Sequence, residues 1–267
     1  MLGRGRGARG RVGRAGGRRR GADPARGSVD EPMRAVTFDF GQTLAELDTA
    51  MLASRLAERG VTVAASALED ARPAMWRRYN EAIRAGLGGH PWVLLMATLL
   101  RSAGVEEAAV DPLSEWLFIE QPRRNLWRRP IAGMIDRVRA LRARGIPVGV
   151  ISNSEGGLAG LISEMGWTHD FDVVADSGAL GMEKPDRAIF DWTAEGLGVH
   201  PAEVVHVGDS WAADYLGARA AGMRAVLFRG RDLMPSGAVL EVDSRGAACE
   251  SPDELDEVLR AMGLSGG

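Results

Sequence analysis

The pattern of hydrophobic positions changes character twice along the chain. Residues 33–40 carry the apolar run Ala35-Val36-Thr37-Phe38, which is typical of a buried strand. From Ala50 to about Arg128, apolar residues recur at helical spacing between glycines and prolines, and no convincing strand interrupts them. After Pro130, short apolar strands alternate with helices, so this part predicts a parallel sheet covered on both faces.

The alternating part of the chain predicts its elements individually, because glycines and prolines separate the apolar runs. Strands are expected at residues 147–151, 172–175, 203–207 and 225–228, and helices at 132–144, 156–165, 186–196, 211–221 and 252–262.

The strand at 33–40 is separated from the other strands by the long helical stretch, which predicts an inserted domain. We expect an α/β core at 33–46 and 129–267 and a helical cap at 47–128. In open α/β sheets, ligands bind at the carboxyl ends of strands. Asp39, Ser152 and Asp209 stand at such ends, so the insert would cover the site and exclude water.

Asp39 is the first candidate for chemistry, because an ionised carboxylate at the end of a buried strand is costly unless a cation meets it. A carboxylate can also attack phosphorus. The Ser152 hydroxyl and nearby backbone N–H groups can hold phosphate oxygens. Lys184, which Pro185 follows, can neutralise phosphate charge and keep a nucleophile ionised.

Two further carboxylates, Asp209 and Asp214, follow the strand predicted at 203–207. Beside Asp39 they would repel one another unless a hard divalent cation were present. Oxygen ligands and a phosphate substrate favour Mg²⁺ as that cofactor.

Four motifs in this order resemble the haloacid dehalogenase-like (HAD) hydrolase superfamily. The resemblance covers about 33–46 and 129–230, and the helical insert resembles the family's C1-type cap. It implies a Rossmann-like three-layer α/β core with a parallel sheet. The motifs are Phe38-Asp39-x-Gly41-x-Thr43-Leu44, Ile151-Ser152-Asn153-Ser154, Gly181-x-x-Lys184-Pro185-Asp186 and Val207-Gly208-Asp209-Ser210-x-x-x-Asp214.

The resemblance also implies roles for these residues. Asp39 would be the nucleophile and a Mg²⁺ ligand, together with the backbone carbonyl of Gly41. Asp209 would be a direct ligand, and Asp214 a second ligand or an outer partner. The phosphoryl group would be bound by Ser152, Asn153 and Lys184, with Thr43 shaping the loop around it.

Gly41 departs from the family pattern, since most phosphatase members have an acid/base Asp there. Such a group typically contributes about 10²–10⁴-fold in rate. A substrate with a good leaving group needs little protonation, and a water or Gln42 could position the nucleophile. Gln42 itself cannot act as a general acid near neutral pH.

The leading hypothesis is therefore a Mg²⁺-dependent phosphatase acting on a small phosphorylated metabolite through an aspartyl-phosphate. A 2-haloacid dehalogenase would also use an Asp nucleophile without the acid/base Asp, but it needs no metal, so Asp209 and Asp214 argue against it. The third hypothesis is a non-catalytic phospholigand-binding or regulatory protein. It is motivated by Gly41, which stands where an acid/base Asp would be expected.

Charge and composition restrict the partners. The net charge of −3 divides into +6 for residues 1–32, an Arg/Gly-rich segment expected to be disordered, and −9 for the remainder. The acidic body shows no basic face for nucleic acid. Cys249 is the single cysteine and no stretch is long and apolar enough for a membrane span, so we expect a cytoplasmic monomer or homodimer.

Structural or surface roles are expected for most of the remaining polar and aromatic candidates. The histidines lack metal-ligand spacing, so structural or surface roles are expected for His90, His169, His200 and His206. Helix packing is expected for Trp76, Tyr79, Trp92, Trp116 and Trp127. The cluster Trp76-Arg77-Arg78-Tyr79 with Arg84 is a candidate for selecting an anionic substrate.

Overall fold

The computed structural model of the chain describes residues 32–86 and 91–264. The expectations for the Arg/Gly-rich segment, residue 32 excepted, and for His90 lie outside the described residues.

A six-stranded sheet forms the centre of the molecule, with the order β5-β4-β1-β6-β7-β8 and parallel pairing throughout. Because β1 lies between β4 and β6, Phe38 is paired with both Val150 and Val207. The carboxyl ends of these three strands therefore meet at one edge. The strands are β1 (Ala35–Phe38), β4 (Val148–Ser152), β5 (Val173–Asp176), β6 (Val204–Gly208), β7 (Arg224–Phe228) and β8 (Gly246–Cys249).

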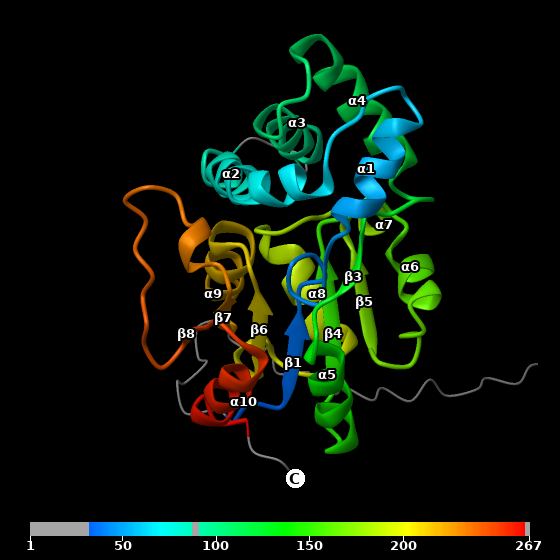
Figure 1. The fold of residues 1–267 in the computed structure, drawn as a ribbon. Coiled ribbons are helices and arrows are strands. Elements are labelled where there is room, and N and C mark those ends of the chain that lie inside the picture. The colour runs from blue at the N-terminus through cyan, green and yellow to red at the C-terminus, as the bar shows by residue number, and fades with distance from the viewer. Residues whose placement is uncertain (1–31, 87–90, 265–267) are drawn as a thin grey trace, which may run out of the picture.

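Helices cover the sheet on both sides (Figure 1), which explains why every residue of β1, β4, β6 and β7 is buried. The fold class is therefore the expected one. The covering and connecting helices are α5 (Met134–Ala143), α6 (Leu158–Glu164), α7 (Ser177–Leu180), α8 (Arg187–Gly196), α9 (Gly217–Ala221) and α10 (Pro252–Ala261).

Four more helices lie above the carboxyl edge of the sheet (Figure 1). They are α1 (Thr49–Ala57), α2 (Ala65–Arg84), α3 (Trp92–Ser102) and α4 (Glu107–Glu120). The chain leaves for them through β2 (Ala45–Leu47) and returns through β3 (Trp127–Pro130), and these two short strands pair antiparallel. We call residues 48–126 the helical insert; a boundary between core and cap at 46/47 and 128/129 stays a prediction.

Several elements differ from expectation, and the short strand β2 and the short helix α7 are among those not predicted. The strand β3 lies partly in the stretch that the pattern assigned to helices. It was not predicted, because Trp127-Arg128-Arg129-Pro130 has no apolar alternation. The edge strand β8, Gly-Ala-Ala-Cys, has no β-branched residue. The helix expected at 211–221 begins as a π-helix over Trp211–Leu216 and becomes α9 only at Gly217.

Candidate active site

Asp39, Ser152 and Asp209 lie where the sequence placed them, at the carboxyl ends of β1, β4 and β6. The backbone N–H of Asp39 donates to the carbonyl of Val207 at 2.8 Å, which ties the start of the loop to the neighbouring strand. All three side chains are nearly buried.

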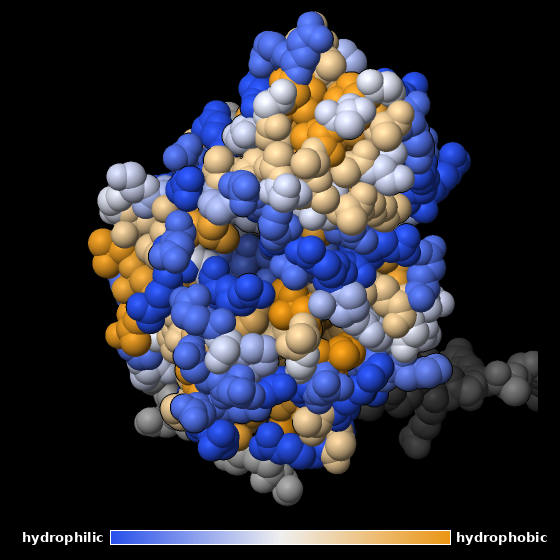
Figure 2. All heavy atoms as spheres, viewed as in Figure 1, coloured by the Kyte–Doolittle hydropathy of each residue, from blue (hydrophilic) through white to orange (hydrophobic). Residues whose placement is uncertain are grey.

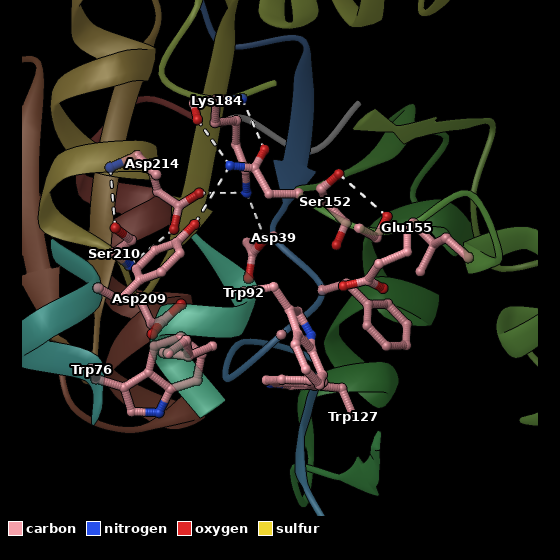
Figure 3. Close-up of a pocket in the computed structure, with 18 of the residues that line it drawn as sticks. Asp39, Trp76, Trp92, Trp127, Ser152, Glu155, Lys184, Asp209, Ser210 and Asp214 are labelled. Atoms are coloured by element: carbon pink, nitrogen blue, oxygen red, sulfur yellow. Dashed lines mark hydrogen bonds and ion pairs between the residues drawn. The ribbon is translucent and has the colours of Figure 1, made fainter. Parts of the chain in front are cut away.

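Lys184 connects these strand ends. Its Nζ donates to Asp39 Oδ1 at 2.5 Å and to Asp214 Oδ1 at 2.6 Å (Figure 3). It also donates to the carbonyl of Ile151 at 2.8 Å. The side chain is 2% exposed, and these bonds use all three ammonium hydrogens. Burial opposes the charge, but the carboxylates of Asp214 and Asp39 raise the pKa of Lys184 above its usual value.

Asp214 is surrounded by donors. Besides Lys184, its Oδ1 lies 3.1 Å from His206 Nε2, and its Oδ2 accepts from the backbone N–H of Ser210 at 2.9 Å. Burial opposes ionisation, yet Lys184 and His206 hold the pKa of Asp214 well below its usual range. Gly208 permits this approach, since a Cβ there would lie 2.3 Å from Asp214 Cγ.

His206 supports Asp214 from within the sheet. It is fully buried in β6, and burial lowers its pKa, so the ring is neutral. The Nδ1 atom lies 2.9 Å from the Thr37 hydroxyl. Because a carboxylate only accepts, Nε2 carries the proton toward Asp214 and Nδ1 accepts from Thr37.

Asp39, Asp209 and Asp214 each place a carboxylate oxygen within 4.8 Å of the others. Burial raises the pKa of Asp39 to about 7 against the influence of Lys184. Burial, followed by the charges of Asp39 and Asp214, raises the pKa of Asp209 well above its usual value. Asp209 Oδ2 is buried and has no hydrogen-bond partner among the described residues. A single ammonium among three buried carboxylates leaves an excess of negative charge. This excess, together with the unpartnered oxygen of Asp209, fits a divalent cation.

Asn153 fixes the loop that carries Lys184. Its Nδ2 donates to the carbonyl of Lys184, and its Oδ1 accepts from the Lys184 backbone N–H, both at 2.8 Å. Asn153 Nδ2 also lies 3.5 Å from the Tyr79 hydroxyl of α2, so the same side chain reaches the helical insert.

A cavity of about 60 Å³ lies between these residues and the helical insert. Since one water needs about 10–15 Å³ on this measure, the space suits a small ligand. Hydrophilic residues predominate along the boundary between the two parts on the face shown in Figure 2. The cavity is thus bordered by the charged sheet edge on one side and the insert with β3 on the other.

The wall opposite the sheet edge is aromatic. The ring centroids of Trp76 and Trp127 are 6.3 Å apart, those of Trp92 and Trp127 are 6.0 Å apart, and those of Trp76 and Tyr79 are 5.6 Å apart, all edge to face. In Figure 3 the tryptophans lie on the far side of Asp39 from Lys184. We call Trp76, Tyr79, Trp92 and Trp127 the aromatic wall.

Glu155 also lines the cavity, from the loop after β4. Its side chain forms no ion pair with the part of the chain that the structure describes. Burial raises its pKa to about 8, so this carboxyl is largely protonated at neutral pH.

Asn80 of α2 joins the insert to the sheet edge. Its Oδ1 accepts from the Ser210 hydroxyl at 2.5 Å, and its Nδ2 donates to the carbonyl of Leu233 at 3.3 Å. The structure thus records the insert in contact with the loop that carries Asp209 and Asp214.

The structure brings most of the expected site residues together. The cavity is lined by Asp39, Gly41, Ser152, Asn153, Lys184, Asp209 and Asp214. Thr43 is the exception: it is fully buried beside the loop, does not line the cavity, and its hydroxyl has no partner among the described residues.

Other expectations need correction. Arg77, Arg78 and Arg84 are exposed and do not line the cavity, so the proposed anion-selecting cluster is not supported. Helix packing was expected for five aromatic residues, and four of them also line the cavity; Trp116 does not. Glu155 and Asn80 were not predicted as site residues, because neither stands in one of the four motifs.

Comparison with known proteins agrees with this geometry. A family model described as haloacid dehalogenase-like hydrolase matches residues 33–222. Haloacid dehalogenase-like hydrolase domain-containing protein 3 of Bos taurus is 32% identical over 208 residues, which are 74% of this chain and 82% of that protein.

Two phosphatases are also similar. Phosphoserine phosphatase of Thermus thermophilus is 34% identical over 60% of this chain and 63% of its own length. Glyceraldehyde 3-phosphate phosphatase of Methanopyrus kandleri is 29% identical over 86% of this chain and 98% of its own length.

Solved structures show the same fold. The HAD hydrolase YfnB of Bacillus subtilis, described as bound to magnesium, has a TM-score of 0.63 at 18% identity and covers 86% of this chain and 99% of its own. A dehalogenase has a TM-score of 0.56 at 22% identity, over 85% of this chain and 97% of its own. Within residues 32–86 and 91–264, no helix is long and apolar enough to cross a membrane. Motifs, fold and relatives agree: the chain belongs to the haloacid dehalogenase-like hydrolases and is a hydrolase.

Proposed function

We propose that the protein is a Mg²⁺-dependent phosphatase that removes the phosphoryl group from a small phosphorylated metabolite through an aspartyl-phosphate. The observation that carries this proposal is the buried Lys184 ammonium bonded to both Asp39 and Asp214, beside the unpartnered carboxylate oxygen of Asp209. The two similar phosphatases and the small cavity support it.

The first step is an attack by an Asp39 carboxylate oxygen on phosphorus. The new O–P bond forms as the bond from phosphorus to the leaving oxygen breaks, and the electron pair stays on that oxygen. Lys184 neutralises part of the charge on the phosphoryl oxygens, while the Ser152 hydroxyl donates to one of them. Asp214 and His206 hold Lys184 in position rather than contacting the substrate.

The second step is hydrolysis of the aspartyl-phosphate. Water attacks phosphorus, the O–P bond to Asp39 breaks, and inorganic phosphate and the free carboxylate result. The helical insert keeps other water away from the charged groups, which strengthens their interactions with the phosphoryl group.

The residues present fit Mg²⁺. Asp39, Asp209 and the backbone carbonyl of Gly41 would hold it, and it would neutralise charge on the transferred phosphoryl group. Both Asp214 oxygens already accept hydrogen bonds, so we place Asp214 outside the direct ligands. A metal-independent dehalogenase would leave the buried Asp209 carboxylate without a function.

The test is a panel of phosphate esters that includes p-nitrophenyl phosphate, assayed with Mg²⁺ and with EDTA. We expect Mg²⁺-dependent release of phosphate and a loss of at least about 10³-fold in Asp39→Asn. Asp111→Asn, which changes an exposed carboxylate of α4, is the matched control and should keep full activity. Wild-type rates in Asp39→Asn, or halide release from a 2-haloacid in EDTA, would contradict the proposal.

A further inference from the structure

Gly41 stands where most phosphatases of this family carry their acid/base Asp, and its backbone does not explain the glycine. The left-handed residue of this loop is Gln42, with φ of 59°, and Gly41 is not among the glycines with positive φ. An L-residue could therefore adopt the backbone conformation of Gly41. The reason for glycine must lie in the space around it.

Trp127 occupies that space. A Cβ built on Gly41 would lie 3.2 Å from Trp127 Cδ1 and 3.4 Å from Trp127 Nε1, and 3.9 Å from Asp39 Oδ2. The first distance is shorter than ordinary van der Waals contact, and a carboxylate would extend further toward the same ring. Either the indole moves or the side chain does not fit.

The indole is held in place by its neighbours. Trp76 and Trp92 both pack edge to face against it, with centroid distances of 6.3 and 6.0 Å. Both neighbours are buried, Trp92 almost completely. Moving Trp127 would disturb this whole packed group, so Gly41 and Trp127 form a complementary pair.

The Trp127 N–H belongs to the edge of the ring nearest Gly41, since Nε1 lies 3.4 Å from the position of a Gly41 Cβ that is itself 3.9 Å from Asp39 Oδ2. Trp127 lines the cavity, and its backbone N–H donates to Asn125 Oδ1 at 2.8 Å, whereas its indole N–H makes no hydrogen bond to residues 32–86 or 91–264. An indole N–H can donate a hydrogen bond, but it does not release its proton at neutral pH.

We propose that Trp127 replaces the missing acid as a hydrogen-bond donor to the leaving oxygen, and that the enzyme consequently acts on aryl or enol phosphates. Such alcohols depart as oxyanions: the P–O bond breaks, its electron pair stays on the leaving oxygen, and that oxygen takes a proton from water after release. The aromatic wall provides edges and faces for a planar, unsaturated group. This inference rests on the proposed phosphatase activity.

Glu155 is the competing candidate, because it is a largely protonated carboxyl on the same cavity. If it served as general acid, the substrate would not need a good leaving group. The experiment below therefore includes Glu155→Gln.

The experiment measures kcat/KM with p-nitrophenyl, phenyl and propyl phosphate, in order of increasing basicity of the leaving group. We expect the wild type to prefer p-nitrophenyl over propyl phosphate by at least about 10³-fold, since the acid's contribution of about 10²–10⁴-fold is missing. Trp127→Phe, which keeps a ring without the N–H, should lose about 10- to 100-fold on phenyl phosphate.

Two variants at Gly41 distinguish the steric effect of Trp127 from the effect of the missing acid. Gly41→Asp alone should not gain propyl phosphate activity, whereas Gly41→Asp with Trp127→Val should gain at least about tenfold. Circular dichroism confirms that each variant is folded.

Four results would overturn the inference: equal rates on all three esters, unchanged kinetics in Trp127→Phe, a gain in Gly41→Asp alone, or no gain in the folded double variant. A steeper leaving-group dependence in Glu155→Gln would assign the acid to Glu155 and also overturn it. Absence of turnover with every ester would instead remove the phosphatase proposal itself, so the two failures are distinguishable.

Discussion

The two sides of the cavity are built on different principles. On the sheet edge, Lys184, Asp214 and His206 are joined by hydrogen bonds that use every ammonium hydrogen and both Asp214 oxygens. On the aromatic wall, Trp76 and Trp92 pack edge to face with Trp127. The buried indole N–H groups of Trp76 and Trp92 have no partners among the described residues. Ion pairs and hydrogen bonds hold the side chains of the sheet edge in place, whereas ring packing holds those of the aromatic wall.

This difference indicates how the two sides can change. A buried charge cannot lose its partner without a large penalty, so the sheet edge tolerates few substitutions. Aromatic side chains contribute through packing, which tolerates changes of similar volume. We therefore assign the phosphoryl chemistry to the sheet edge and the choice of leaving group to the aromatic wall.

The largest expected effect comes from breaking the charged side. Lys184→Met removes the ammonium and leaves the buried carboxylates of Asp39 and Asp214 without their counter-charge, which should cost about 3–5 kcal/mol of unfolding free energy. Phosphatase activity should fall by at least about 10²-fold. Urea unfolding and p-nitrophenyl phosphate hydrolysis measure the two effects.

Arg187→Met is the control, because it removes an exposed cation of the same segment that, among the described residues, pairs only with Asp191 at the surface. If Lys184→Met unfolded at the same urea concentration as Arg187→Met, the charged network would not hold the site together.

A smaller effect concerns the pH dependence of Mg²⁺ binding. Burial raises the pKa of Asp39 to about 7, so below that pH Mg²⁺ must displace a proton from this carboxyl. Affinity should therefore rise by about tenfold per pH unit up to about pH 7 for each proton displaced, and less steeply above. Isothermal titration calorimetry with Mg²⁺ alone at several pH values measures this.

Asp111→Asn should show the same profile as the wild type, since Asp111 is an exposed residue paired with Arg101. A Mg²⁺ affinity that does not change between about pH 5.5 and 8 would contradict the raised pKa of Asp39.

The smallest effect is expected where the helical insert meets the sheet edge. Asn80→Ala removes the acceptor of the Ser210 hydroxyl and the donor to Leu233, a loss of about 1–2 kcal/mol in contacts that join the insert to the sheet edge. KM should rise about 3- to 10-fold with little change in kcat. Steady-state kinetics with p-nitrophenyl phosphate measure both constants.

Thr98→Ala is the matched control for Asn80, because its hydroxyl donates to the carbonyl of Leu94 within α3 and to no other group in the part of the chain that the structure describes. An equal rise of KM in both variants would show that general loosening of the insert, and not the contact with Ser210, is responsible.

The chain order explains which features were predictable. Asp39, Ser152 and Asp209 follow apolar strands, and parallel strands bring such ends together, so the sequence placed them correctly. The contact of Trp127 with Gly41 was not predictable, because it depends on the antiparallel pairing of β2 and β3, whose sequences carry no strand pattern. The same holds for Asn80, which reaches Ser210 only through the packing of α2.

His206 shows an intermediate case. The lack of metal-ligand spacing predicted a structural or surface role for it, and in the structure the side chain is fully buried. Its bond to Asp214 depends on the turn of the π-helix after β6, and local sequence does not specify that turn.

The most direct test of the central claim is to trap the covalent intermediate. The wild-type protein is mixed with p-nitrophenyl phosphate and Mg²⁺, quenched in acid and digested, and the peptides are analysed by mass spectrometry. We predict one phosphoryl group on the peptide that contains Asp39, and none in Asp39→Asn. Steady turnover with no phosphorylated peptide, or with the phosphoryl group on another residue, would contradict the account.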